Sequence, residues 1–343
     1  MAILPFWTKN TRSGPFNDPA VMGPYCEFLA KRYAGKNVFF VLGGDTAGTD
    51  VQPVTDAEAA GLLKGAKEAG VAKIMITFHP TGRQSSSFWF QERPWLDFNS
   101  IQSGHFINTT NFQIVTGDYA KAPIKPTFDM EPGYENITNN LVRDASAATA
   151  PRIQAVDVRR SAYLSVLAGA AGHTYGNGEV YEFYHVPANG APPAGNAGWH
   201  ANMEWKDALK LPASGQIQHL RHLMESRPML SLIPDQAFIA GENGARALDR
   251  IAAARSENGD YAFVYLPTGK KTVTINTGKL SGSTLKSWWY DPRTGSAVVI
   301  DTAPKTDTRE FTIPASELAA GTDDWVLVVD DASKNYGTPG KAN

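Results

Sequence analysis

Acidic residues stand at the ends of two apolar runs that are typical of buried strands. The run NVFFVLGGD is apolar up to two glycines and ends in Asp45, and KPTFDMEPGYE carries Asp129, Glu131 and Glu135. Two carboxyl groups that face each other across a pocket can cleave a glycosidic bond, because one protonates the leaving oxygen while the other attacks the anomeric carbon or activates water. Asp45 and Glu131 are therefore our candidate catalytic residues.

Each of these acids also has a structural interpretation. Asp45 could cap the following helix or bind a loop, and this is about as probable as catalysis on the pattern alone. Asp129 and Glu131 share one side of a strand, and acids packed this closely repel one another unless some are protonated or paired. For Asp129 and Glu135, a salt bridge is the preferred interpretation.

Aromatic and polar side chains are interleaved after the next apolar run. That run, AKIMITFHP, ends at His79, and FWFQERPWLDFNSIQSGH follows a loop that contains Arg83. Flat apolar surfaces mixed with hydrogen-bonding groups suit a sugar, which offers apolar faces and hydroxyls, although a well-packed loop explains the pattern equally well. The residues expected to bind substrate are Trp7, His79, Arg83, Trp89, Gln102, His105, Glu135, His173 and Tyr175.

Metal and cofactor chemistry find little support in the sequence. The spacing of His79, His105 and His173 matches no recognised metal-ligand motif. The chain has no GxSxG elbow, phosphate loop or dinucleotide fingerprint, so neither a metal nor a cofactor is expected.

The elements that would position these residues alternate between strands and helices as far as about residue 235. Strands are predicted at 3–7, 37–45, 73–79 and 125–131, with a weaker one at 172–175 that would deliver His173 and Tyr175. In a parallel barrel the C-terminal strand ends form the active-site face, so the candidate residues would meet there.

Three helices are predicted between these strands, at residues 18–34, 55–69 and 151–168. In the first, Val21, Tyr25, Phe28 and Leu29 would lie on the buried face. Thr55 and Glu58 would form a capping box at the start of the second, and Pro151 would occupy the first turn of the third.

Beyond Pro234 the pattern changes to short alternating strands separated by polar turns. They are predicted at 261–266, 272–276, 285–290, 297–300, 310–313 and 325–329, which favours an antiparallel sandwich. We therefore divide the chain into a (β/α) barrel domain with the candidate catalytic residues at 1–233, a β-sandwich domain at 234–333 and a flexible tail at 334–343. Of the adjacent Trp288 and Trp289, at most one can face outward to bind polysaccharide.

The composition limits the partners. Of 343 residues, 42% are hydrophobic and 19% charged, which predicts a folded chain of about two domains. The net charge of −2 provides no excess of positive charge for nucleic acid, and no apolar run is long enough for a membrane span. The single cysteine, Cys26, is expected to be buried and inert. The opening lacks a signal-peptide pattern.

Five long motifs together resemble apiosidase-like glycoside hydrolases. They are YCEFLAKRYAGKNVFFVLGGD, ITFHPTGRQSSSFWFQERPWLDFNSIQSGH, KPTFDMEPGYE, VRRSAYLSVLAGAAGHTYGNG and SWWYDPRTG. The resemblance implies an α/β fold, namely a (β/α)8-type TIM barrel followed by an all-β antiparallel sandwich of the collagen-binding type. It also implies cleavage of glycosidic bonds in plant-type polysaccharide or oligosaccharide, including release from apiose in complex pectin.

The resemblance further implies roles for the two acids, with Asp45 as general acid/base and Glu131 as nucleophile or base. It suggests a secreted or periplasmic location. Family members normally carry two further βα units before the strand at residues 3–7, so the barrel is expected to be N-terminally incomplete. A non-catalytic carbohydrate-binding protein or inactive remnant is therefore the alternative, and a metal-dependent hydrolase is a third interpretation.

Overall fold

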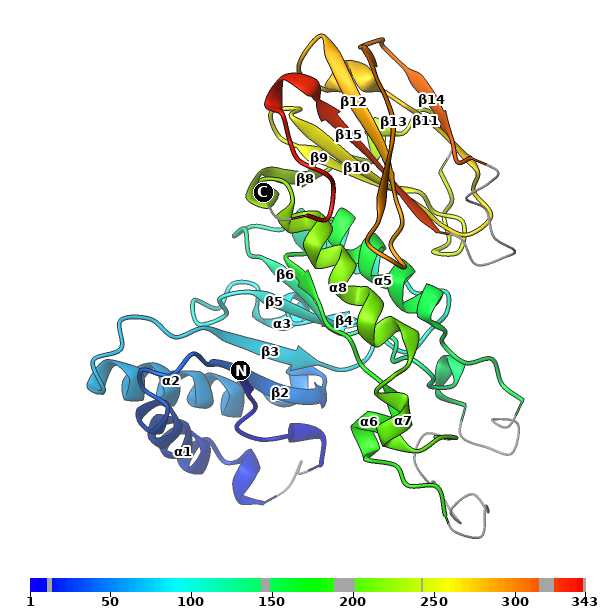
Figure 1. Ribbon diagram of the computed structural model, residues 1–343. Helices are drawn as coiled ribbons and strands as arrows, with labels where there is room; N and C mark the ends of the chain where they lie inside the picture. The colour runs from blue at the N-terminus through cyan, green and yellow to red at the C-terminus, as the bar shows by residue number, and fades with distance from the viewer. Residues whose placement is uncertain (11–13, 143–148, 188–200, 242, 315–323, 342–343) are drawn as a thin grey trace. The chain divides into compact units, whose positions relative to one another are not determined.

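The computed structural model describes residues 1–10, 14–142, 149–187, 201–241, 243–314 and 324–341. The chain forms two compact units (Figure 1). Unit 1 comprises residues 1–103, 113–130 and 170–172, and unit 2 comprises residues 104–112, 131–169 and 173–343. The first part of the chain is mixed α/β, and the C-terminal part is an antiparallel sheet, as the sequence predicts.

Unit 1 contains a sheet of parallel strands in the part of the chain where the first strands are predicted. Strands β1 (Ala2–Ile3), β2 (Phe39–Thr46) and β3 (Ile76–Pro80) form one sheet, in which β2 pairs in parallel with both neighbours. A second sheet has the order β4-β5-β6-β7. Its strands are β4 (Gln84–Ser85), β5 (Asn99–Gln102), β6 (Thr127–Glu131) and β7 (Gly172–His173). The last residue of β6, Glu131, and the last residue of β7, His173, belong to unit 2.

Helices α1 (Pro19–Arg32) and α2 (Gln52–Glu68) lie side by side beneath β2 and β3 (Figure 1). Glycines let their backbones approach closely, because a Cβ added at Gly61 would lie 2.0 Å from the carbonyl oxygen of Gly23 and one at Gly65 would lie 2.3 Å from that of Glu27. Short helices α3 (Ser87–Phe90) and α4 (Asn111–Tyr119) follow. Buried Cys26 lies in the α1–α2 core, and burial raises the pKa of its thiol.

Of the four residues predicted to lie on the buried face of α1, Leu29 is buried and the other three are not. The side chains of Val21, Tyr25 and Phe28 are 41%, 40% and 57% exposed, whereas Met22 and Cys26 are buried. Two adjacent faces of this helix are apolar, and the face that carries Met22 and Cys26 is the one packed into the core. The predicted start is confirmed, since the Asp18 carboxylate accepts a hydrogen bond from the Ala20 amide.

The predicted starts of the other two helices, by contrast, are wrong. Helix α2 begins at Gln52, so Thr55 and Glu58 are buried inside it and form no capping box. Pro53 in the first turn fixes the helical φ there and sets the earlier start. Helix α5 (Ala155–Leu167) begins after Pro151, with a capping box between Gln154 and Asp157.

Unit 2 contains α5 and the remaining helices. They are α6 (Gly178–Glu182), α7 (Trp205–Ala208) and α8 (Pro212–Glu225). Helix α5 packs against α8, and a small core of Ile137, Ile153, Val158 and Ala213 joins them to the loop after β6.

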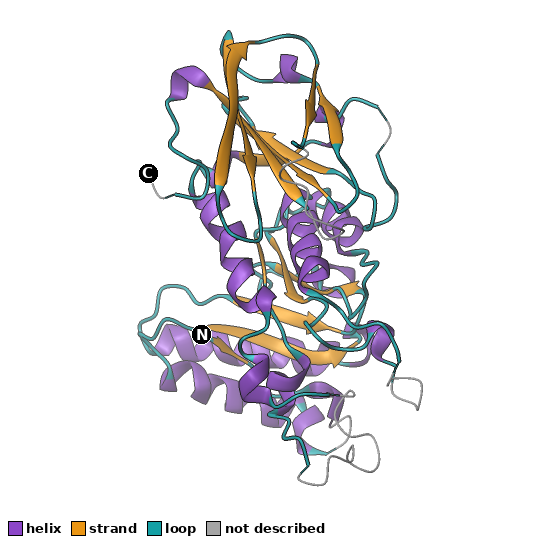
Figure 2. Ribbon diagram, turned by 45° about the vertical axis from the view of Figure 1, so that its right-hand side comes forward, coloured by secondary structure: helices purple, strands orange, loops and turns teal. Residues whose placement is uncertain are grey.

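The C-terminal sheet has the order β13-β12-β15-β10-β9-β8 and is antiparallel at each pairing along it (Figure 2). Its strands are β8 (Leu232–Pro234), β9 (Ala252–Ser256), β10 (Tyr261–Leu266), β12 (Thr284–Tyr290), β13 (Ala297–Pro304) and β15 (Trp325–Asp331). A second, two-stranded sheet pairs β11 (Thr272–Ile275) with β14 (Arg309–Thr312). One hydrophobic core contains residues of both sheets.

Neither tryptophan of the SWWY motif is available to solvent. Trp289 belongs to the core between the sheets and is 2% exposed. Trp288, on the opposite side of β12, is 4% exposed and its indole N–H donates to Asp330 at 3.1 Å. Asp330 in turn pairs with Arg227 at 2.7 Å. The proposed polysaccharide contact through one of these tryptophans is therefore wrong, because both are buried.

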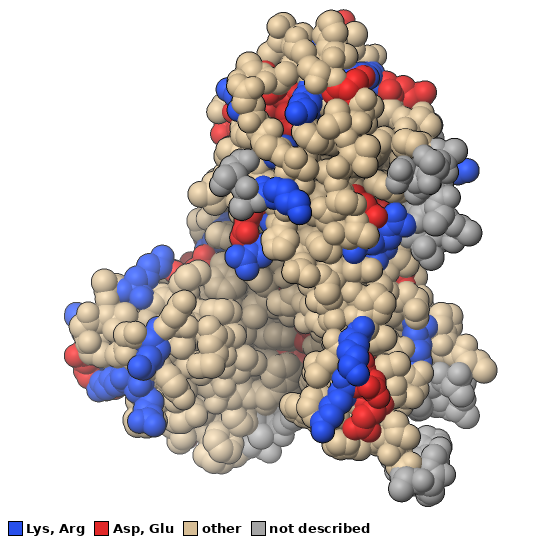
Figure 3. All heavy atoms as spheres, in the orientation of Figure 1, with Lys and Arg blue, Asp and Glu red and all other residues tan. Residues whose placement is uncertain are grey.

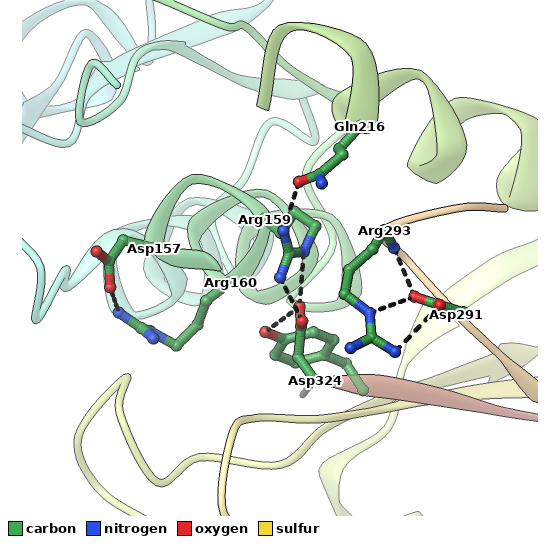
Figure 4. Close-up of polar contacts among 8 residues, drawn as sticks. Asp157, Arg159, Arg160, Gln216, Asp291, Arg293 and Asp324 are labelled. Atoms are coloured by element: carbon green, nitrogen blue, oxygen red, sulfur yellow. Dashed lines mark hydrogen bonds and ion pairs between the residues drawn. The ribbon is translucent and has the colours of Figure 1, made fainter. Parts of the chain in front are cut away.

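Buried charges tie α5 to the C-terminal sheet within unit 2 (Figure 4). The Arg159 guanidinium donates to Asp324 through Nε at 3.1 Å and Nη2 at 2.6 Å, and it also donates to Gln216 of α8. The Tyr265 hydroxyl of β10 donates to Asp324 at 3.1 Å, and its ring stacks on Tyr163 of α5 at 5.0 Å. The sheet is therefore an integral part of the packing around α5.

Candidate active site

A glycine-built bulge at the end of β2 sets the position of Asp45. Gly43 pairs with His79 of β3 but Thr46 pairs with Pro80, so two residues are inserted between consecutive partners. Both inserted residues, Gly44 and Asp45, have positive φ values, 126° and 49°. Bulges often redirect a side chain beside an active site, and a non-glycine residue in this conformation is a further sign of a functional position.

The two glycines are required by the rings packed against them. A Cβ at Gly43 would lie 2.5 Å from the Phe78 ring, and one at Gly44 would lie 2.8 Å from the Trp7 indole. The Trp7 and His79 rings are 5.2 Å apart. Trp7 and His79, both predicted to bind substrate, thus lie together beside Asp45.

The Asp45 carboxylate remains partly accessible. It forms an ion pair with the Lys9 ammonium, and the two side chains are 19% and 51% exposed. The Asp45 amide lies 3.4 Å from Nδ1 of His79, which is 3.0 Å from the Pro80 carbonyl oxygen. Lys9 was not among the predicted site residues, since no pattern in the sequence connects it with a residue 36 positions away.

The other predicted residues of unit 1 occupy different settings. Trp89 is half-buried and packs on Gly48, where a Cβ would lie 2.6 Å from the indole. Arg83 is exposed, and its amide donates to the Gln102 carbonyl at 2.6 Å. Gln102 is 6% exposed, and its side-chain oxygen is buried without a hydrogen-bond partner in the described part of the chain.

In unit 2, Glu131 is held by His105. The Glu131 carboxylate oxygen lies 3.3 Å from Nε2 of His105, and the two side chains are 13% and 6% exposed. Nδ1 of His105 accepts a hydrogen bond from the Tyr134 amide at 3.3 Å. Because a nitrogen that accepts carries no proton, a neutral His105 ring has its proton on Nε2, the nitrogen that faces Glu131.

Tyr134 extends this group. Its ring meets the His105 ring edge-on at 4.5 Å. In the sequence, Tyr134 lies between Glu131 and Glu135 of KPTFDMEPGYE. It was not among the predicted site residues, because the prediction considered only the acids of this segment. The described contacts therefore form a continuous group of Glu131, His105 and Tyr134.

Asp129 and Glu135 both have hydrogen-bond partners within the protein. Asp129 is completely buried and accepts a hydrogen bond from the Ser103 hydroxyl at 3.1 Å. Glu135 is 3% exposed and accepts from the Tyr175 hydroxyl at 2.7 Å and from the Ala213 amide at 3.0 Å. Burial and the neighbouring Glu135 raise the pKa of Tyr175.

His173 stands at the end of β7 and is half-buried. Over the described ranges, no three His, Cys, Asp or Glu side chains are grouped as a metal site would require. Nor does any helix there combine the length and apolarity that a bilayer crossing needs. On the face drawn in Figure 3, basic and acidic side chains are interspersed.

The predicted residues thus form separate groups. Trp7, Asp45 and His79 come together in unit 1, while Glu131 joins His105 and Glu135 joins Tyr175 in unit 2. Asp45 and Glu131 belong to different units, and their action as one pair is a proposal considered below.

Comparison with known proteins gives family matches over most of the chain. Residues 1–231 match the model described as "Apiosidase-like, catalytic domain", and residues 233–330 match "Putative collagen-binding domain of a collagenase". Among curated proteins, no match was found.

Two solved structures are similar over nearly the whole chain, each with 32% identity and a TM-score of 0.85. One is described as a glycoside hydrolase, and the match covers 98% of this chain and 74% of that one. The other is a glycoside hydrolase family 5 protein from Bacteroides vulgatus, with 99% and 72% covered.

Proposed function

We propose, on the premise that this chain belongs to the apiosidase-like family of glycoside hydrolases, that Asp45 and Glu131 together cleave a glycosidic bond. Asp45 acts as the general acid/base and Glu131 as the nucleophile or the base. The substrate is a plant-type polysaccharide or oligosaccharide, with an apiosidic bond as the first candidate.

Exposure of the four candidate acids carries this proposal. The side chains of Asp45 and Glu131 are 19% and 13% exposed. Asp129 is completely buried and Glu135 is 3% exposed, and both are engaged in hydrogen bonds to the protein. A carboxyl group that protonates or attacks a substrate must be reachable, and shielding from bulk water strengthens its electrostatic interactions.

The neighbours of the two acids suit these roles. Lys9 and the bulge orient the Asp45 carboxylate, and the Nε2–H of His105 orients that of Glu131. Trp7 offers a flat aromatic face beside Asp45.

The arrangement that would bring the acids together is a (β/α)8-type barrel. We assign residues 1–233 to this domain, with Asp45 and Glu131 both at C-terminal strand ends, where a barrel forms its active site. Residues 234–333 form the β-sandwich domain, and residues 334–343 form a tail.

The test is hydrolysis of a panel of 4-nitrophenyl glycosides that includes the apioside, with pectic oligosaccharides alongside. Asp45→Asn and Glu131→Gln should each lower kcat/KM by about 10²–10⁴-fold, the usual contribution of a positioned acid or base. Glu257→Gln, at an exposed turn of unit 2, is the control and should retain full activity.

Two results would contradict the proposal. Wild-type levels of hydrolysis by both variants would remove the acids from the reaction. Glycan binding by the parent chain without any turnover would instead support the non-catalytic alternative. For an active enzyme, NMR of the first-formed anomer separates retention, expected for carboxyl groups about 5–5.5 Å apart, from inversion at about 6.5–9.5 Å.

A further inference from the structure

A hollow in unit 2 is lined by residues that follow Glu131 in the sequence. It has a volume of about 410 Å³, within the usual range for small-molecule pockets. Its lining is mainly aromatic and aliphatic, with Tyr134, Tyr175, Asn177, Val180, Tyr181 and Leu209 among the residues that form it. We call it the tyrosine pocket.

Tyr134 connects the tyrosine pocket to the candidate catalytic group. Its ring lies 4.5 Å from that of His105, whose Nε2 is 3.3 Å from the Glu131 carboxylate. On the other side, a Cβ at Gly176 would lie 2.1 Å from the Tyr134 ring, so glycine is required there. The Tyr134 ring is therefore fixed in position, and it contacts both the tyrosine pocket and the His105–Glu131 pair.

Several polar groups of the tyrosine pocket are already engaged. The Tyr175 hydroxyl donates to Glu135 at 2.7 Å, and the Ser214 hydroxyl donates to the Leu211 carbonyl at 2.7 Å. The Asn177 oxygen accepts from the first amides of α6, at Glu179 and Val180. A sugar ring placed here would leave some hydroxyls without partners, at about 1–3 kcal/mol for each buried one.

An aromatic ring has the opposite requirements. It needs flat apolar surface, and tyrosine rings supply this in the tilted arrangement that aromatic groups prefer. The Tyr134 and Tyr181 rings are 6.1 Å apart at an interplanar angle of 49°. Tyr181 is 61% exposed, so the pocket is open on that side.

We propose that the tyrosine pocket binds an aromatic aglycone, a phenolic ring at the end of an oligosaccharide substrate, attached to the sugar whose bond is cleaved. This inference rests on the proposed glycosidase function, and it names the chemistry of one part of the substrate. Tyr181 and Leu209 are specificity-determining residues in this account.

Direct binding of 4-nitrophenol, followed by NMR titration, tests the pocket independently of catalysis. Tyr181→Ala should weaken binding about 3–10-fold, as expected for the loss of one aromatic contact. Leu209→Trp should weaken it by a similar factor by filling the space. Tyr119→Ala, which removes an exposed tyrosine of unit 1 that does not line the pocket, is the matched control and should change nothing.

Kinetics then tests the assignment as an aglycone site. Phenyl and methyl glycosides of the same sugar are compared, with circular dichroism to verify folding of each variant. Tyr181→Ala and Leu209→Trp should lower kcat/KM about 3–10-fold for the phenyl glycoside and leave the methyl glycoside within about twofold. Equal losses on both substrates, or phenol binding that neither variant alters, would overturn the inference. If the chain hydrolyses no glycoside but binds 4-nitrophenol, and Tyr181→Ala and Leu209→Trp weaken that binding, the proposed function is refuted and the aromatic specificity of the pocket stands.

Discussion

Removing one partner of the Arg159–Asp324 pair should destabilise unit 2 strongly. The two side chains are 4% and 0% exposed, and Asp324 accepts two hydrogen bonds from Arg159 and one from Tyr265. Asp324→Asn keeps the shape but leaves a buried guanidinium without its counter-charge, which costs about 3–5 kcal/mol. Arg159→Met leaves the carboxylate with Tyr265 alone and should cost a similar amount.

The assay is urea unfolding followed by circular dichroism, with the double variant Arg159→Met/Asp324→Asn completing a thermodynamic cycle. Because the double variant leaves no unpaired charge, its loss should be smaller than the sum of the single losses by about 1–3 kcal/mol. Arg221→Ala, which breaks an exposed pair with Glu225, should have little effect. Additive losses in the cycle, or single losses no larger than that of Arg221→Ala, would refute the reasoning.

Two further predictions concern α2. Gly61→Ala places a Cβ 2.0 Å from the Gly23 carbonyl oxygen, so it should lower the free energy of unfolding by about 1–3 kcal/mol in a thermal melt. The control Gly215→Ala, which has open space at its Cβ, should be neutral or stabilising. Equal effects of the two variants would argue against close packing of α1 and α2. Burial raises the pKa of Glu58 from 4.5 to about 8, so between these pH values the folded state holds a proton that the unfolded state has lost. The free energy of unfolding should therefore fall by about 1.4 kcal/mol for each pH unit between about 4.5 and 8. Glu58→Gln should abolish that slope in melts across this range.

The strand ends were predictable because buried parallel strands are apolar throughout. The residues 37–45 and 125–131 correspond to β2 (Phe39–Thr46) and β6 (Thr127–Glu131), and the candidate acids stand at their ends. Short strands such as β4 and β9 were missed, since two to five residues carry too little periodicity to detect. The exposed face of α1 was misassigned because helical spacing alone does not choose between two neighbouring apolar faces.

Contacts between residues distant in the sequence could not be predicted from local pattern. Lys9 reaches Asp45 across 36 positions, and Arg159 reaches Asp324 across 165. The tyrosine pocket combines residues from the loop after β6, from α6 and from the α7–α8 region, which only the fold brings together. The bulge at LGGD was not predicted either, although its two glycines are the residues that permit it.

The account depends most on Asp45 and Glu131 acting as one catalytic pair, and the kinetics of the double variant test this directly. Residues that act as a unit show strongly non-additive losses, so Asp45→Asn/Glu131→Gln should be scarcely slower in kcat/KM than the slower of the two single variants. Losses that multiply in the double variant would mean that the two carboxylates contribute independently, and the single-site account would be wrong.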